Sequence, residues 1–298
     1  MYNQVMGEGM GSTQRTEKGP EGKAGTEVQK GTLYILGIGP GNIDHLSQRA
    51  CQVLESVDAV AGYTTYIDLV RPLIQEKQII STGMTKEVQR VEEAIDQALE
   101  GKSCALISSG DPGIYAMSGL VFEMCQNKNI SVTPAASLAD KRTAKNELQV
   151  EIIPGIPALC AGASLLGSPI SHDFAVISLS DLLTPWEDIE KRIEGAAMAD
   201  FVLAIYNPKS KKRDWQLQKA QEIILKYRSA ETPVGIVVSA MREEERTQIV
   251  SLGNLHKAEV NMQTIIFVGN KNTERYLDFM VTPRGYSKKY SFAANGAK

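Results

Sequence analysis

Short apolar runs alternate with amphipathic segments along the first half of the chain. Apolar runs that end in glycine or polar residues are typical of buried strands, and they occupy 33–38, 58–62, 103–109 and 150–153. Apolar residues recur every three to four positions, as in helices, at 46–57, 88–99 and 114–126. This alternation favours a mostly parallel α/β sheet with helices on its faces.

The second half shows a similar alternation without repeating the first. Strands are predicted at 174–178, 201–206, 234–238, 246–251 and 264–269. Helices are predicted at 158–166, 187–197 and 215–227. The pattern therefore indicates two unlike α/β domains, at 31–157 and 158–287, joined near Pro157.

Three stretches lie outside this pattern. Residues 1–30 have too few large apolar side chains to offset the entropy of ordering them, so a disordered tail is predicted there. Residues 288–298 form a second tail. The polar stretch at 126–149 is interpreted as a surface insertion between a helix and a strand, either a disordered loop or a segment with a role of its own.

Composition narrows the class of protein. The formal net charge is −3, so the protein as a whole has no positive electrostatic field that would attract nucleic acid. There is no apolar run of about 18 residues for a membrane helix and no apolar core of a signal peptide, so a cytoplasmic protein is expected. The four cysteines are scattered and the three histidines lack metal-site spacing, so no metal held by the protein is expected.

Small-residue turns follow predicted strands in both halves. They are 37–42, 108–115, 154–158, 206–208 and 239–242. Each could be an ordinary turn, and the first is not a dinucleotide fingerprint because Asn42 stands where a third glycine belongs. Ligands in α/β sheets bind beyond the carboxyl ends of strands, so together the turns predict a ligand cleft between the halves. No Ser–His–Asp arrangement stands out, which suits group transfer from an activated donor by positioning.

Several of these motifs resemble those of the tetrapyrrole methylase family, and within it the precorrin-3B C(17)-methyltransferases. The resemblance covers about residues 32–286. The resemblance rests on the motifs at 37–41, 62–67, 81–84, 108–115, 154–156, 172–174, 206–213 and 281–286. The most discriminating block is ISLSDLLTPW at 177–186.

The resemblance implies the tetrapyrrole methylase fold, two unlike α/β domains with S-adenosylmethionine in the cleft between them, in a homodimer. Carried over by position, the cofactor-binding residues are Gly110, Asp111, Pro112, Ile114, Pro157, Ala158, Tyr206, Asn207, Ala240 and Thr264. Pro40 faces the reaction centre in the family, and Gly39 and Tyr63 are candidates for binding substrate. Asn42 is a further catalytic candidate. The family commonly has Asp there; an obligatory role of that acid in proton transfer would be lost with Asn, whereas a role as a polar cap would survive the change.

The implied reaction is methylation of carbon 17 of precorrin-3B or its cobalt form, with contraction of the macrocycle, in cobalamin biosynthesis. The partner is then a tetrapyrrole: precorrin-3B, cobalt-precorrin-3 or cobalt-factor III. Any cobalt belongs to the substrate, and no nucleic acid or membrane partner is implied. The alternatives are another tetrapyrrole methylase activity, or a non-catalytic tetrapyrrole-binding protein that has kept the fold.

A basic run follows the turn at 206–208. Lys211, Lys212 and Arg213 lie in an otherwise slightly acidic chain. They either orient the carboxylates of a tetrapyrrole, with Arg213 gripping one of them in a bidentate contact, or form the solvated start of a helix.

Overall fold

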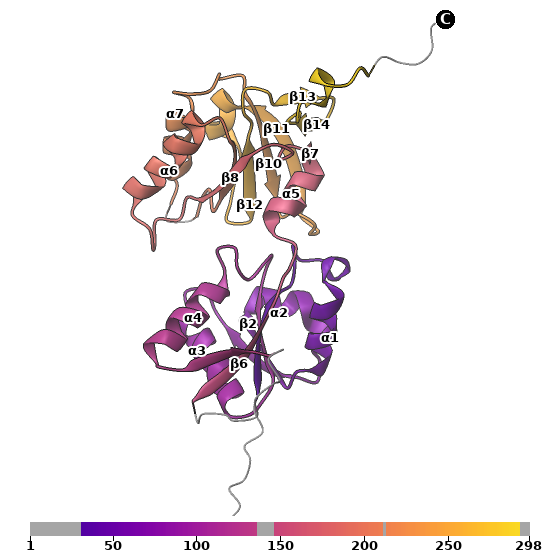
Figure 1. The fold of residues 1–298 in the computed structure, drawn as a ribbon, viewed down its shortest axis with the longest axis vertical. Coiled ribbons are helices and arrows are strands. Elements are labelled where there is room, and N and C mark those ends of the chain that lie inside the picture. The colour runs from indigo at the N-terminus through magenta and orange to yellow at the C-terminus, as the bar shows by residue number, and fades with distance from the viewer. Residues whose placement is uncertain (1–30, 136–145, 211–212, 293–298) are drawn as a thin grey trace, which may run out of the picture.

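The structure, a computed structural model, describes residues 31–135, 146–210 and 213–292. They form two α/β domains that follow one another in sequence (Figure 1), which confirms the expected fold class. The chain crosses between the domains at Pro154–Pro157. The domain bounds given above stay a prediction. The tail predicted at 1–30 and residues 293–298 of the second tail lie outside the described residues.

The N-terminal domain holds one parallel sheet with the strand order β3-β2-β4-β1-β6-β5. Its strands are β1 (Thr32–Gly37), β2 (Ala59–Tyr63), β3 (Gln78–Thr82), β4 (Cys104–Ser108), β5 (Ser131–Pro134) and β6 (Glu147–Ile153). Its helices are α1 (Gln48–Ser56), α2 (Thr64–Val70), α3 (Glu87–Leu99) and α4 (Met117–Asn127), with the 3-10 turns η1 (Ile43–His45) and η2 (Arg71–Leu73).

Both faces of this sheet are covered. Helices α3 and α4 pack on one face, and α1 and α2 pack on the other. The central strands β1 and β4 are therefore almost continuously apolar, as is usual for strands buried on both sides. Because every strand is parallel, the carboxyl ends of β1, β2 and β4 share one edge. That edge faces the second domain (Figure 1).

The C-terminal domain holds a mixed sheet with the strand order β11-β10-β12-β9-β8, in which only β8 and β9 are parallel neighbours. Its strands are β8 (Phe174–Ser178), β9 (Val202–Tyr206), β10 (Pro233–Val238), β11 (Arg246–Ser251) and β12 (Thr264–Val268). Helices α6 (Trp186–Met198) and α7 (Gln216–Ile224) and the 3-10 turn η3 (Leu252–Lys257) cover one face. Helix α5 (Ala158–Leu166) covers the other.

A three-stranded sheet with the order β13-β14-β7 closes the α5 side. It consists of β7 (Gly167–Ser168), β13 (Glu274–Tyr276) and β14 (Phe279–Val281), and Met280 of β14 is fully buried in the core beneath α5. A last 3-10 turn, η4 (Tyr286–Lys288), follows, so the predicted tail at 288–298 begins at the end of this turn.

The prediction of an unstructured insertion at 126–149 is wrong for the residues that the structure describes. Helix α4 continues to Asn127, β5 follows, and β6 already begins at Glu147. The pattern hid β5 because this four-residue edge strand has one large apolar residue, Val132. It hid the start of β6 because buried Leu148 and Val150 alternate with polar neighbours. Residues 136–145 lie outside the described part of the chain.

Candidate functional site

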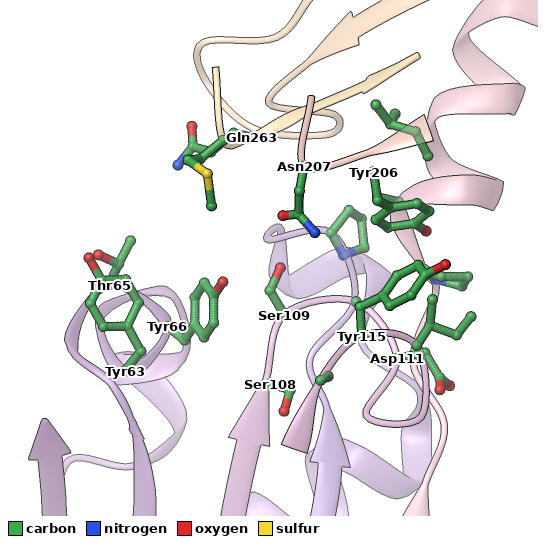
Figure 2. Close-up of a pocket in the computed structure, with 18 of the residues that line it drawn as sticks. Tyr63, Thr65, Tyr66, Ser108, Ser109, Asp111, Tyr115, Tyr206, Asn207 and Gln263 are labelled. Atoms are coloured by element: carbon green, nitrogen blue, oxygen red, sulfur yellow. The ribbon is translucent and has the colours of Figure 1, made fainter. Parts of the chain in front are cut away.

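A cavity of about 440 Å³ lies between the two domains (Figure 2), within the range of about 300–1,000 Å³ that is usual for small-molecule sites. Loops that follow β1, β2 and β4 form one wall, and α5 and the ends of β9, β10 and β12 form the other. The predicted site residues that line it are Pro40, Tyr63, Gly110, Asp111, Ile114, Pro157, Ala158, Tyr206, Asn207, Ala240 and Thr264.

Three turns pack backbone against backbone beneath this cavity. The Gly110 N–H donates to the Gly39 carbonyl at 2.7 Å, and the Gly39 N–H donates to the Gly110 carbonyl at 3.1 Å. A Cβ atom on Gly155 would lie 2.2 Å from the Gly110 carbonyl oxygen, and one on Gly37 would lie 2.5 Å from the same oxygen. Glycine is therefore required at 37 and 155, and Gly39 supports the cavity from behind instead of lining it.

The Asp111 carboxylate connects two of these turns. It accepts the Gly113 N–H at 2.8 Å and the Gly155 N–H at 3.2 Å. Its two oxygens thus hold the Gly-Asp-Pro turn after β4 against the crossing between the domains. Pro112 belongs to the same turn but does not line the cavity.

Two tyrosine rings form an apolar wall at one end of the cavity (Figure 2). The centroids of Tyr115 and Tyr206 are 5.3 Å apart. Tyr115 has a φ of 52°, which is rare for an aromatic residue, and its hydroxyl donates across the domain boundary to the Val176 carbonyl at 3.2 Å. Burial raises the pKa of Tyr206 to about 12, so its phenol stays neutral and accepts the Leu159 N–H at 2.8 Å.

A second pair of tyrosines marks the opposite end. Tyr63 and Tyr66 meet edge to face, with centroids 5.3 Å apart, and in Figure 2 they lie across the cavity from Tyr115. Met84, Glu87 and Arg90 line the cavity as well. Ser109 stands between the two ends in Figure 2 and also lines the cavity.

Arg242 reaches across the cavity from the C-terminal domain. Its Nε donates to the Pro40 carbonyl at 2.7 Å, and its Nη2 donates to the Ser109 hydroxyl at 2.9 Å. It thereby fixes the turns after β1 and β4 relative to the turn after β10. The site residues predicted from the sequence did not include Arg242 or Arg90. Arg242 could have been found because it ends the turn at 239–242, which follows a predicted strand. No pattern in the sequence indicated that Arg90 belongs to the site.

Asn42 does not line the cavity. Its side-chain oxygen accepts the Asp44 N–H at 3.0 Å and caps η1. Asn and Asp are equally good in that position, because both offer a side-chain oxygen to the free N–H groups of the first turn. The structure thus gives Asn42 a capping role, and its catalytic role stays a prediction.

Arg213 is buried away from the cavity, with 7% of its surface exposed. Its Nη1 donates to the carbonyls of Leu179 at 3.0 Å and Asn207 at 3.1 Å, and its Nε lies 3.9 Å from Asp181. The prediction that Arg213 grips a substrate carboxylate is therefore wrong, because its guanidinium is occupied inside the domain. Lys211 and Lys212 lie outside the described residues.

Replacing Arg213 with methionine is expected to lower the free energy of unfolding by about 3 kcal/mol, because two carbonyls and one carboxylate lose a buried charged partner. Urea unfolding measures this. Lys209→Met is the matched control, since Lys209 is exposed in the same basic run, and its effect should stay within about 0.5 kcal/mol. Equal stability of the two variants would contradict the structural role of Arg213.

The described residues contain no cluster of three His, Cys, Asp or Glu side chains that could hold a metal ion. In the same part of the chain, no helix has the length and apolar character needed to cross a membrane.

The architecture and the site define a class of two-domain methyltransferases. The crystal structure of the methyltransferase CobJ superimposes with a TM-score of 0.74 at 30% identity, over 85% of this chain and 100% of that one. Uroporphyrin-III C-methyl transferase from Thermus thermophilus, solved with S-adenosyl homocysteine, shares the fold with a TM-score of 0.62 at 19% identity, over 80% of this chain and 97% of that one.

The sequence places the chain more narrowly. Residues 32–256 match the sequence pattern of the family described as Tetrapyrrole (Corrin/Porphyrin) Methylases. The chain belongs to the tetrapyrrole methylase family, as its motifs indicated.

Curated relatives carry related names. Cobalt-factor III methyltransferase of Priestia megaterium is 50% identical over 262 residues, which are 88% of this chain and 46% of that protein. A probable cobalt-factor III C(17)-methyltransferase of Salmonella typhimurium is 44% identical, over 86% of this chain and 99% of that one. Precorrin-3B C(17)-methyltransferase of a Sinorhizobium species is 33% identical, over 86% and 98%. The chain thus spans less than half of the first relative and almost all of the other two.

Proposed function

We propose that this chain is an S-adenosylmethionine-dependent methyltransferase that methylates carbon 17 of a precorrin-3-type tetrapyrrole in cobalamin biosynthesis, with contraction of the macrocycle. The observation that carries the proposal is one cavity with two differently built ends, flanked by the motifs of the C(17)-methyltransferases. Higher identity to the relatives named for cobalt-factor III than to the one named for precorrin-3B favours the cobalt form of the substrate.

The end near Tyr115 suits the methyl donor. The turns at Gly110 and Pro157 present backbone groups, and Tyr115 and Tyr206 present aromatic faces. Within the described residues, the buried Ser108 hydroxyl lacks a hydrogen-bond partner, so it is free to pair with a ligand. S-adenosylmethionine, bound there, supplies a methyl group that is already activated by the sulfonium charge.

The remaining work of the protein is positioning. Pro40, Tyr63 and Tyr66 would hold the tetrapyrrole against the donor, and small apolar residues such as Ala240 would exclude water. Burial raises the pKa of Tyr66 and of Tyr206, so neither phenol serves as a base near neutral pH. The homodimer implied by the family resemblance and the cytoplasmic location expected from the sequence stay predictions.

Incubation with S-adenosylmethionine and either cobalt-factor III or precorrin-3B, followed by mass spectrometry, tests the proposal. We expect one added methyl group at carbon 17 and faster turnover with cobalt-factor III. Uroporphyrinogen III is the comparison substrate, because its methylation alone would indicate a different activity within the family. Tetrapyrrole binding without methylation of any of the three would favour the non-catalytic alternative.

A further inference from the structure

Among the described residues, the arginine side chains of Arg90, Arg213 and Arg228 are buried, Arg242 is partly buried, and an aspartate stands beside two of the four. Arg213 lies 3.9 Å from Asp181, and Arg228 lies 2.9 Å from Asp200. Neither Arg213 nor Arg228 lines the cavity, although Arg213 donates to Asn207, which does. A buried cation is costly unless an opposite charge accompanies it, so these two aspartates are the expected partners.

Arg90 and Arg242 have no such partner. Within residues 31–135, 146–210 and 213–292, no carboxylate oxygen comes within 4.0 Å of either guanidinium. Arg90, with 4% of its surface exposed, donates to the Thr82 hydroxyl at 2.8 Å and the Gly83 carbonyl at 3.1 Å. Those acceptors are neutral, as are the Pro40 and Ser109 acceptors of Arg242.

The electrostatics agree with this geometry. Burial lowers the pKa of both Arg90 and Arg242. The charge of Glu87, on the same helix as Arg90, opposes the shift of the Arg90 pKa but lies beyond ion-pair distance. Both side chains remain cations at neutral pH, since an arginine begins far above it. Among the described residues, neither of these two positive charges therefore has a carboxylate at ion-pair distance.

Both cations line the cavity, and the charges of both act on Tyr66, where they oppose the rise in the Tyr66 pKa that burial causes. Tyr66 and Tyr63 lie across the cavity from Tyr115 and Asp111 in Figure 2. The two cations thus act on the end of the cavity that lies opposite the one assigned to the methyl donor, although Arg242 also reaches Ser109 between the two ends.

We propose that Arg90 and Arg242 form a carboxylate subsite for an acidic side chain of the tetrapyrrole. The inference rests on the proposed function, because the substrate class carries acetate and propionate groups around its ring. A planar guanidinium matches a carboxylate in geometry and charge. Arg242 also donates a hydrogen bond to the Pro40 carbonyl. A carboxylate bound to Arg242 would therefore position the macrocycle next to the Pro40 turn, which faces the reacting carbon.

Steady-state kinetics of Arg90→Gln and Arg242→Gln test the subsite. We expect the KM for cobalt-factor III to rise about tenfold or more in each variant, as for loss of a charged hydrogen bond, with a weaker dependence on salt. The KM for S-adenosylmethionine should change less than about twofold in Arg90→Gln. A rise confined to S-adenosylmethionine would assign the cations to the donor's own carboxylate and overturn the proposal.

Matched variants separate this role from folding. Thr82→Val removes a hydrogen bond of Arg90 but keeps its charge, and Arg90→Lys keeps the charge without the planar fork, so both should retain more affinity than Arg90→Gln. Arg71→Gln removes one cation from the exposed surface of the same domain and should leave both KM values unchanged. An unchanged tetrapyrrole KM in a folded Arg90→Gln protein would overturn the subsite.

A direct binding measurement keeps the subsite distinct from the proposed activity. Uroporphyrin III is a stable tetrapyrrole polycarboxylate, and its binding is measured by quenching of its fluorescence. Weaker binding by Arg90→Gln than by Arg71→Gln supports the subsite even if the wild-type protein turns over none of the substrates above. Equal binding by these two variants overturns it whether or not the protein is active.

Discussion

Gly155→Ala is expected to weaken the binding of S-adenosylhomocysteine by about 100-fold or more. The added Cβ would lie 2.2 Å from the Gly110 carbonyl oxygen and 2.8 Å from the carbonyl of Gly37. These are backbone atoms that cannot rotate away, so the turns after β1 and β4 must separate from the crossing at Pro154–Pro157. Overpacking costs about 1–3 kcal/mol, and about 2.8 kcal/mol of binding free energy corresponds to about 100-fold in affinity.

Two other glycines provide the control. Gly119 in α4 and Gly195 in α6 have nothing within 4 Å of an added Cβ. Alanine there should stabilise the protein by up to about 1 kcal/mol and leave the affinity unchanged. Calorimetry with S-adenosylhomocysteine and urea unfolding give both quantities. Wild-type affinity in a folded Gly155→Ala protein would show that the glycine contacts do not shape the donor site.

Arg228→Met is expected to produce the largest loss of stability, about 3–5 kcal/mol. Arg228 is buried, lies 2.9 Å from Asp200, and donates to the carbonyls of Ala197 at 2.7 Å and Phe201 at 3.1 Å. It therefore joins the end of α6 to the start of β9. Methionine fills much of the volume but leaves the carboxylate and both carbonyls without this partner.

Lys271→Met is the control for Arg228→Met, because it removes a second cation from the same carboxylate. Lys271 lies 3.7 Å from Asp200, but 75% of its side chain is exposed, so its loss should cost about 0.5 kcal/mol or less. Chemical denaturation of both variants measures the difference. Similar losses for the two would mean that burial of Arg228 is not what matters.

The ends of the buried strands were predictable from the sequence because two local patterns adjoin at each end, an apolar run and a glycine-rich turn. A continuous apolar run specifies a strand buried on both faces, and a glycine-rich turn directly after it specifies where the strand stops, as at β1 and β4. The carboxyl ends of parallel strands share one edge, so the turns could be assigned to a single cleft without knowledge of their distances. Gly110 and Pro157 line the observed cavity for this reason.

Arginine roles could not be predicted because burial and pairing are tertiary properties. Arg213 stands in a basic run and reads as a surface charge, yet it is buried beside Asp181. Arg90 stands in an amphipathic helix among polar residues and reads as solvated, yet it lines the cavity. The prediction missed β5 for a related reason. This strand is stabilised by its pairing with β6, and its own four residues carry too little pattern to predict it.

The continuity of each domain along the chain has a consequence for synthesis. Every strand of the parallel sheet lies between Thr32 and Ile153, so the ribosome completes this domain before it translates any strand of the second sheet. The nascent domain then exposes the Gly110 turn with only half of its cavity built. Because Thr264 lines the other wall, the cavity is complete only after β12 has been translated.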